Sequence, residues 1–158
     1  MLQIQISGGQ TYQFENLVLD YNGTLAIDGH LIDGVADRLR QLADYLKIHV
    51  ITADTFGTVE RALAGLPCQV VILTQADQTQ AKGDYVQQLG ANRVVAIGNG
   101  QNDSLMLERA ALGIATIQEE GAATATLVAS DLVVTRIDAG LDILLHPQRL
   151  NATLRSGK

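Results

Sequence analysis

The chain has few of the residues that mark disulfide-bonded or membrane-spanning proteins. It is 158 residues long and contains one cysteine, two prolines and no tryptophan. A single cysteine, Cys68, permits neither an internal disulfide nor a thiolate metal cluster. No apolar run approaches the ~20 residues that a membrane-spanning helix needs. The first residues also lack the basic and apolar segments of a signal peptide. We therefore expect a cytoplasmic protein that does not span a membrane.

Basic residues are also scarce. Eleven lysines and arginines stand against 17 aspartates and glutamates, which gives a formal net charge of −6. Nucleic acids and anionic membranes both require basic surface patches, so we expect neither as a partner. With 47% hydrophobic and 18% charged residues, the chain has the composition of an ordinary globular protein. Its length is typical of one domain.

The most informative stretch is LVLDYNGTL at residues 17–25. Three apolar residues precede Asp20, and Gly23 and Thr24 follow it, which predicts a buried strand that ends in a turn. A strand that is apolar on both faces is typical of a parallel sheet covered by helices. Ligands of such sheets bind at the carboxyl ends of the strands. Asp20 is therefore expected at the functional edge of the sheet, although an aspartate that only caps a turn fits the local pattern as well.

Strand-like and helix-like segments alternate along the rest of the chain. The polar and apolar alternation of residues 2–6 and 12–14 predicts an N-terminal β-hairpin that extends or covers one sheet edge. Later strands are expected at 47–52, 70–73, 93–97, 112–116 and 132–134, and helices at about 33–46, 56–64, 78–89, 103–110, 122–129 and 139–145. This order predicts a three-layer α/β/α fold with a doubly wound parallel sheet.

We predict a single domain over residues 1–158. It would comprise the hairpin (1–15), a catalytic core (16–145) and a C-terminal tail (146–158). Within the core, Asp28-Gly29 is a hairpin signal between apolar residues, which predicts a short flap after the first core strand. We find no internal repeat and no linker.

Polar residues recur where expected strands end or helices begin. They are Asp20 with Asn22, Thr52, Lys82, and Asn99 with Asp103. Each has an ordinary structural explanation. A β-branched Thr52 suits a strand end, and Lys82 on a helix is usually solvated. The stretch Gly98-Asn99-Gly100 suits a plain strand-to-helix turn, and as a dinucleotide loop it fails because Asp103 takes the place of the third glycine.

Together, the order and chemistry of these residues resemble the four motifs of the haloacid dehalogenase (HAD) superfamily. The resemblance implies a capless Rossmann-like fold and Mg²⁺-dependent phosphoryl transfer. Asp20 would be the nucleophile that forms an aspartyl-phosphate, with Asn22, Thr52 and Lys82 as the other catalytic residues. The implied sites are, for substrate, Thr52, Ala53, Lys82, Gly23 and Asn102, and for Mg²⁺, Asp20, Asn22, Asn99 and Asp103.

The resemblance is closer to one branch of this superfamily, the P-type ion pumps. Thr52-Ala53-Asp54 resembles their Thr-Gly-Asp, and residues 98–103 resemble their Gly-Asp-Gly-x-Asn-Asp. The match covers about residues 16–145, so the chain is similar to the soluble P-type ATPase-like HAD proteins. The chain lacks room for the separate domain through which the pumps bind ATP, which weakens an ATPase interpretation.

Two positions depart from the family pattern. HAD phosphatases usually carry a second aspartate where this chain has Asn22, and an amide cannot give or take a proton near neutral pH. Turnover should be slower by about 10²–10⁴-fold if general acid–base catalysis is lost. Asn99 stands where the family has a metal-binding aspartate, and its neutral oxygen predicts weaker Mg²⁺ binding.

Two functional hypotheses follow. The first is a HAD-type phosphatase that acts on a phosphorylated substrate of unknown identity. The second is a non-hydrolytic phosphate- or phosphoprotein-binding module, in which Asn22 and Asn99 mark lost turnover. The gaps from Asp20 to Thr52 and from Thr52 to Lys82 are too short for a cap domain. By resemblance, capless members act on large substrates or use a neighbouring subunit as the lid, so a homo-oligomer fits this pattern.

Overall fold

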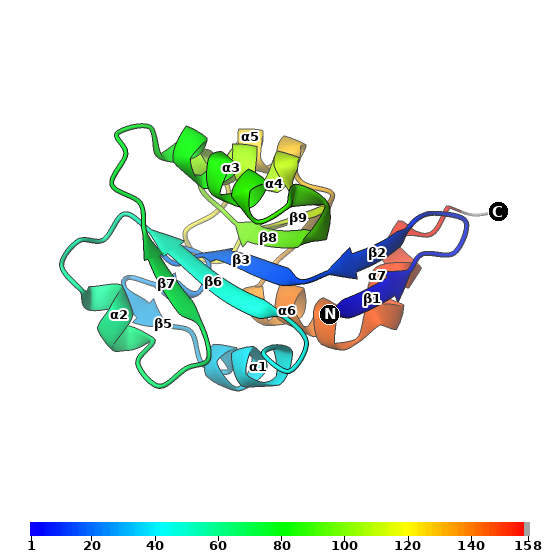
Figure 1. Cartoon of the computed structure of the whole chain (residues 1–158), viewed down its shortest axis with the longest axis horizontal. Helices are drawn as coiled ribbons and strands as arrows, with labels where there is room; N and C mark the ends of the chain where they lie inside the picture. The colour runs from blue at the N-terminus through cyan, green and yellow to red at the C-terminus, as the bar shows by residue number, and fades with distance from the viewer. Residues whose placement is uncertain (157–158) are drawn as a thin grey trace.

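The computed structural model describes residues 1–156 and shows a three-layer α/β/α fold (Figure 1). A six-stranded parallel sheet has the order β10-β9-β8-β3-β6-β7. Its strands are β3 (Asn16–Asp20), β6 (Lys47–Thr52), β7 (Gln69–Ile72), β8 (Val94–Gly98), β9 (Leu112–Thr116) and β10 (Leu132–Val134). The predicted doubly wound parallel sheet is confirmed.

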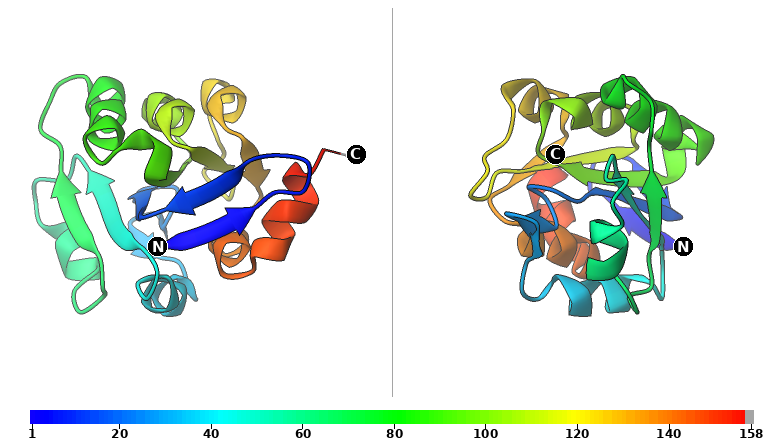
Figure 2. Two further views of the ribbon diagram at one scale, coloured as in Figure 1. Left: turned by 45° about the vertical axis from the view of Figure 1, so that its right-hand side comes forward. Right: turned by 90° about the vertical axis from the view of Figure 1, so that its left-hand side faces the viewer.

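Helices cover both faces of this sheet, as the two views of Figure 2 show. The upper layer in Figure 1 contains α3 (Gln78–Gln88), α4 (Ser104–Arg109) and α5 (Thr124–Ala129), and the lower layer contains α1 (Val35–Leu42), α2 (Thr58–Ala62) and α6 (Ile137–Leu145). Short 3₁₀ turns, η1 (Ala91–Arg93) and η2 (Gln101–Asp103), precede β8 and α4. Between β3 and α1 lies only a small flap of two strands, β4 (Ala26–Ile27) and β5 (His30–Leu31).

Strand β3 lies at the centre of the fold, and all five of its residues are buried. Successive side chains of a strand point to opposite faces. Val18 accordingly joins the apolar core under α3 and α4, whereas Leu17 and Leu19 join the core formed with α1 and α6. This two-sided burial is why the stretch before Asp20 is continuously apolar.

The chain path creates a switch point beside β3. From β3 the chain moves to β6 and β7 on one side, and α3 then carries it back to β8 on the other side. Asp20 pairs with Ile51 of β6, and Leu19 pairs with Ile97 of β8. The carboxyl ends of β3, β6 and β8 therefore meet at one edge, where doubly wound folds bind their ligands.

The N-terminal hairpin is present, but its predicted position is wrong. Strands β1 (Leu2–Gln5) and β2 (Thr11–Phe14) form a separate two-stranded sheet that pairs with neither edge of the main sheet. Because β2 leads directly into β3, the hairpin projects from the amino end of the central strand (Figure 1).

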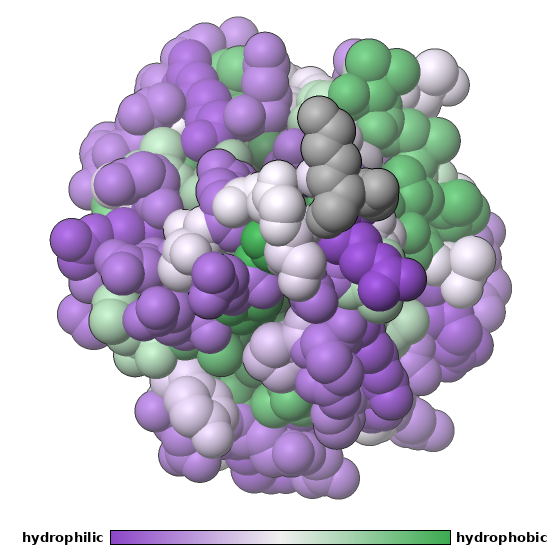
Figure 3. Space-filling model, turned by 90° about the vertical axis from the view of Figure 1, so that its right-hand side faces the viewer, coloured by the Kyte–Doolittle hydropathy of each residue, from purple (hydrophilic) through white to green (hydrophobic). Residues whose placement is uncertain are grey.

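The predicted C-terminal tail contains a helix, α7 (Pro147–Leu154). Pro147 occupies its first position, where proline is favoured. Leu150 of α7 is fully buried in the same core as Ile4 and Phe14 of the hairpin. Residues 157–158 of the predicted tail lie outside the described residues. Mostly hydrophilic side chains cover this end of the molecule (Figure 3).

Several helix boundaries differ from the sequence-based expectations. Helix α1 begins after Gly34, which has a left-handed φ of 86°, and not at residue 33 as expected. Helix α2 has only five residues, because a loop occupies residues 53–57. Over residues 1–156, every helix is too short or too polar to cross a bilayer.

Candidate active site

The switch point opens into a cleft of about 210 Å³. It is lined by side chains from the ends of three strands and from two loop-to-helix junctions: Asp20, Asn22, Thr52, Ala53, Gln78, Lys82, Asn99, Gly100 and Asn102. Seven of the predicted site residues are therefore brought together here. The other two, Gly23 in the turn after β3 and Asp103 in η2, lie directly behind this lining.

Lys82 links the polar groups on the cleft floor. Its Nζ donates hydrogen bonds to Asp20 Oδ1 at 2.8 Å and to Asp103 Oδ1 at 2.7 Å. A longer contact of 3.5 Å reaches Asn102 Oδ1. Lys82 is only 2% exposed, and lysines are rarely buried unless they are paired. The alternative of a solvated surface lysine is therefore excluded.

The charges in this network do not balance. Two buried carboxylates, Asp20 and Asp103, share the single ammonium group of Lys82. Burial and repulsion from Asp103 raise the pKa of Asp20 to about 7, against the opposing effects of Lys82 and Thr24. Burial alone would lower the pKa of Lys82, but attraction by both carboxylates outweighs it, and the pKa is raised. A cation placed beside Asp20 would favour its ionised form.

The donor set beside Asp20 fits a magnesium ion. The Thr24 hydroxyl lies 3.1 Å from Asp20 Oδ2 and 3.3 Å from Asn99 Oδ1, so both oxygens lie within reach of one hydroxyl and close to each other. Asn99 Nδ2 donates to the carbonyl of Gly121 at 3.0 Å, which turns the amide oxygen toward Asp20. Carboxylate and amide oxygens are the ligands that Mg²⁺ prefers, and it commonly uses only one or two carboxylates together with waters and substrate phosphates.

The acidic part of this donor set is small. Within residues 1–156, no group of three or more His, Cys, Asp and Glu side chains is placed to hold a metal ion. Asp103 is fully buried and already occupied, because its Oδ2 accepts from the backbone N–H groups of Asn99 and Gly100 and its Oδ1 accepts from Lys82. Asp103 therefore supports the loop and the lysine from behind the cleft.

Thr52 lies at the cleft, at the end of β6. Its Oγ1 accepts from the Asp54 N–H at 3.1 Å, and in the described part of the chain its own proton has no acceptor. The proton is therefore available to a ligand. Asp54 in turn accepts from the N–H groups of Phe56 and Val59, so it organises the loop and does not contact Lys82.

Gly23 contributes through its backbone conformation. Its φ is +81°, and a Cβ built there would lie 2.4 Å from Asn99 Nδ2, so only glycine fits this contact. Its N–H donates to the carbonyl of Ala26 at 2.8 Å, which leaves that group unavailable to a phosphate. Gly23 thus lets the loop after Asp20 pack directly against Asn99.

Two glutamines of the site were not predicted from the sequence. Gln78 lines the cleft one helical turn before Lys82, and its Nε2 donates to two backbone carbonyls, those of Leu73 and Gln75. Its buried Oε1 has no hydrogen-bond partner among the described residues. Gln118 contacts the loop after Asp20 from behind. Neither residue belongs to a sequence motif, so no local signal identifies them.

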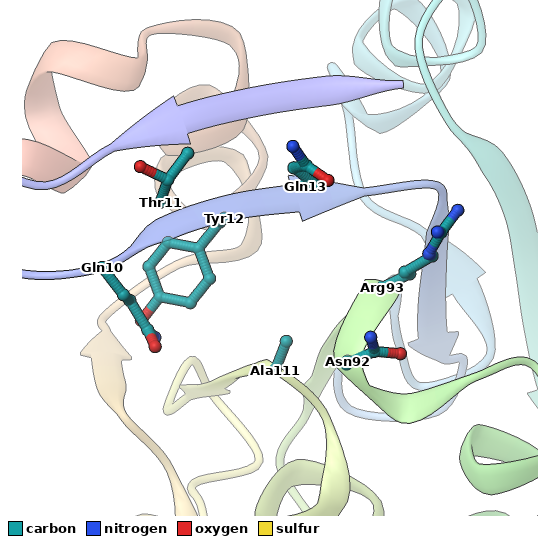
Figure 4. Close-up of a pocket in the computed structure, with 7 residues that line it drawn as sticks. All are labelled: Gln10, Thr11, Tyr12, Gln13, Asn92, Arg93 and Ala111. Atoms are coloured by element: carbon teal, nitrogen blue, oxygen red, sulfur yellow. The ribbon is translucent and has the colours of Figure 1, made fainter.

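A larger hollow of about 450 Å³ lies at the opposite end of the sheet (Figure 4). It is lined by Gln10, Thr11, Tyr12, Gln13, Asn92, Arg93 and Ala111. Arg93, its one cationic side chain, is paired with Glu15. None of the strand-end residues lies near this hollow, so size alone does not indicate the site.

Comparison with known proteins identifies two relatives from one organism. The chain is 51% identical over 63 residues to the uncharacterized protein MJ0073 of Methanocaldococcus jannaschii, which covers 40% of this chain and 68% of that protein. It is 44% identical over 39 residues to the uncharacterized protein MJ0072 of the same organism. That match covers 25% of this chain and 89% of that protein. The chain belongs to the same family as these two proteins. No protein-family model matches the sequence.

Solved structures show which fold this is. A cobalt-bound deoxy-D-mannose-octulosonate 8-phosphate phosphatase from Haemophilus influenzae superposes with a TM-score of 0.71 and 16% identity over 91% of this chain and 94% of that one. A 3-deoxy-D-manno-octulosonate 8-phosphate phosphatase from Moraxella catarrhalis, in complex with a magnesium ion, a phosphate ion and a KDO molecule, superposes with a TM-score of 0.65 and 20% identity over 89% of this chain and 90% of that one. The fold is therefore that of the HAD hydrolases, without an added cap.

Proposed function

We propose that this protein is a Mg²⁺-dependent HAD-type phosphatase that acts through an aspartyl-phosphate on Asp20. One observation carries the proposal. Lys82 is buried at the switch point and bridges Asp20 and Asp103, residues that lie 62 and 21 positions away in the sequence. Burying such a network is costly, and pKa values perturbed by burial cluster at functional sites.

The first step would transfer the phosphoryl group of a phosphate monoester to Asp20. A carboxylate oxygen of Asp20 forms the new bond to phosphorus while the bond to the leaving-group oxygen breaks. Lys82 and the Thr52 hydroxyl would hold the phosphate oxygens and neutralise the charge that develops on them. Asp20, Asn99 and the backbone carbonyl of Asn22 would hold Mg²⁺, which supplies further neutralisation of phosphate charge. Asp103, the fourth ligand that the resemblance implies, would stand behind them, because its oxygens already accept from Lys82 and from backbone N–H groups.

Proton transfer would limit both halves of the reaction. The leaving-group oxygen needs a proton, and water attacking the aspartyl-phosphate must lose one. Asn22 can do neither, so solvent would have to serve. The exposure of Asn22 gives water that access. We infer a slow turnover and a long-lived phosphoenzyme, which suits the P-type ATPase-like motifs at 52–54 and 98–103.

The second candidate function is a phosphate- or phosphoprotein-binding module. The two amides, Asn22 and Asn99, favour it because both stand at positions where a carboxylate would speed turnover. The open, capless cleft is compatible with a large phosphorylated partner or with a second subunit as the lid. A binding module would take up a phosphate mimic but release no phosphate.

The substitution Asn22→Asp distinguishes the two functions. It restores an ionisable group beside the cleft, so a phosphatase should hydrolyse para-nitrophenyl phosphate about 10²-fold faster in the presence of Mg²⁺. Asp20→Asn should abolish that release, and Asp44→Asn, an exposed aspartate on the far side, should not change it. If Asn22→Asp and the wild type both release no phosphate above the Asp20→Asn background, the phosphatase proposal is wrong.

A further inference from the structure

A strap formed by residues 118–123 lies across the back of the candidate site. It begins at Gln118, two residues after β9, with a left-handed φ of 48°. The Nε2 of Gln118 donates to the carbonyls of Gly23 and Thr24, each at 2.9 Å, and its Oε1 accepts from the Ile137 N–H at 2.9 Å. Both ends of this amide are therefore bonded to backbone groups, and the loop after Asp20 is tied to the start of α6.

The other end of the strap holds Asn99. The Gly121 carbonyl accepts from Asn99 Nδ2 at 3.0 Å, and the Ala123 N–H donates to the Asn99 carbonyl at 2.9 Å. One segment of six residues thus contacts both loops that carry the candidate metal ligands. Gln118 is the only side chain of the strap that bonds to the loop after Asp20 among the described residues.

The two loops touch at the point where the ligands converge. Gly23 packs against the Asn99 amide so closely that a Cβ would overlap it. The next residue, Thr24, places its hydroxyl between Asp20 Oδ2 and Asn99 Oδ1. A shift of residues 23–24 would therefore change the separation of those two oxygens. The positive φ of Gln118 costs about 1 kcal/mol or more, and such a conformation is retained in a non-glycine residue only where its surroundings require it.

We propose that Gln118 is a positioning residue that sets the loop after Asp20 against Asn99 and thereby tunes the affinity of the cleft for Mg²⁺. The claim about Mg²⁺ affinity rests on the proposed function. The claim about the position of the loop does not, because it concerns only contacts within the protein. Partners of this kind, which orient metal ligands without touching the metal, typically change metal affinity by about 10–100-fold when they are removed.

Two substitutions distinguish the loss of the Gln118 side-chain hydrogen bonds from a change in its backbone conformation. Asparagine tolerates a left-handed φ, so Gln118→Asn keeps or relieves the local conformation but is one methylene too short to reach both partners. Gln118→Glu keeps the length and can still accept from Ile137, but it presents a carboxylate to the carbonyls of Gly23 and Thr24. Gln87→Glu, at an exposed position of α3, is the matched control for the added charge.

The first measurement is hydrogen exchange in the metal-free protein. The amides of Gly23, Thr24 and Leu25 are bonded within the turn after Asp20, and those of Leu19 and Ile97 in paired central strands report global opening. In Gln118→Asn, exchange at residues 23–25 should accelerate about tenfold relative to the central strands. Equal acceleration everywhere, or no acceleration, would show a merely structural role and overturn the positioning claim.

The second measurement is a Mg²⁺ titration by calorimetry in the presence of beryllium fluoride. We expect Gln118→Asn and Gln118→Glu to weaken Mg²⁺ binding at least about tenfold, while Gln87→Glu matches the wild type. Unchanged Mg²⁺ affinity in both Gln118 variants would overturn the proposed tuning. Absence of Mg²⁺ binding by the wild type would overturn both the proposed function and the claim about Mg²⁺ affinity. The exchange result would still decide the claim about the position of the loop.

Discussion

Two polar networks tie helix α3 to the central sheet, and they differ in charge. At the carboxyl end of β3, Lys82 of α3 bridges the carboxylates of Asp20 and Asp103. At the amino end, His49 Nε2 lies 3.0 Å from Asn16 Oδ1, and His49 Nδ1 lies 2.8 Å from the hydroxyl of Tyr85, three residues after Lys82. Because Asn16 Oδ1 only accepts, the proton is on Nε2, and Nδ1 accepts from Tyr85.

The difference separates a structural contact from a site prepared for chemistry. The neutral network satisfies both ring nitrogens of His49, whose pKa is lowered by burial and by Lys47. The charged network leaves an excess carboxylate on the floor of a cleft. A neutral, satisfied network stabilises the fold at little cost, whereas a charged and unbalanced one costs stability until a cation arrives.

The largest effect should come from removing the shared cation. Lys82→Met leaves Asp20 and Asp103 buried side by side without a counter-charge, which should lower the free energy of unfolding by about 3–5 kcal/mol. Urea denaturation in EDTA measures this loss. The control Lys47→Met, at an exposed position of β6, should change it by about 0.5 kcal/mol or less. A loss below about 1 kcal/mol in Lys82→Met would mean that the network is not strained as described.

Breaking the neutral network should cost less and should leave the cleft intact. Tyr85→Phe removes the hydroxyl that His49 Nδ1 accepts from, so the free energy of unfolding should fall by about 1–2 kcal/mol. Calorimetry in parallel should show unchanged binding of Mg²⁺ with beryllium fluoride. A large change in that binding would show that the two networks are coupled through α3 and that the comparison fails.

Neutralising the Asp20 carboxylate should raise the free energy of unfolding, whereas the two preceding substitutions lower it. Because the folded-state pKa of Asp20 is raised to about 7, ionised Asp20 opposes folding above that pH. Asp20→Asn should therefore be more stable than the wild type at pH 8 in EDTA, by on the order of 1 kcal/mol. The gain should shrink as the pH falls from 7 toward 4, where wild-type Asp20 is protonated in the folded state. A gain that is constant with pH would contradict this account.

The smallest effect concerns the pH response of the neutral network. A lowered pKa means that unfolded His49 binds protons more readily than folded His49, so its contribution to stability is lost as the pH falls below the unfolded value of about 6.5. Thermal unfolding at pH 7.5 and 5.5 should show a larger loss for the wild type than for His49→Gln. Equal losses would show that His49 does not titrate differently in the folded state.

The sequence predicts where the strand-end residues lie better than it predicts their surroundings. Asp20 and Thr52 end buried strands and Asn99 follows one, and because parallel strands deliver their carboxyl ends to one edge, the three residues lie together at the cleft. Their chemical roles remain predictions, as do the domain boundaries and the cytoplasmic location.

The parts that the sequence did not predict depend on long-range contacts. Gln118 contacts Gly23 and Thr24 across more than 90 residues, and nothing in its local sequence indicates that partner. The position of the hairpin depends on how β2 continues into β3, and its alternating pattern shows only that one face is buried. Helix α1 begins after Gly34 and not at residue 33, because the turn there requires a positive φ.

A thermal-shift series with beryllium fluoride, which mimics a phosphoryl group on aspartate, tests the central claim most directly. Wild type, Asp20→Asn and Asp44→Asn would be compared in EDTA, in Mg²⁺, and in Mg²⁺ with beryllium fluoride. A ligand at a hundredfold excess over its dissociation constant stabilises the folded state by about 2.7 kcal/mol. We predict a shift of that order in wild type and Asp44→Asn, only when both ligands are present. No shift in the wild type, or an equal shift in Asp20→Asn, would contradict a phosphoryl site built on Asp20.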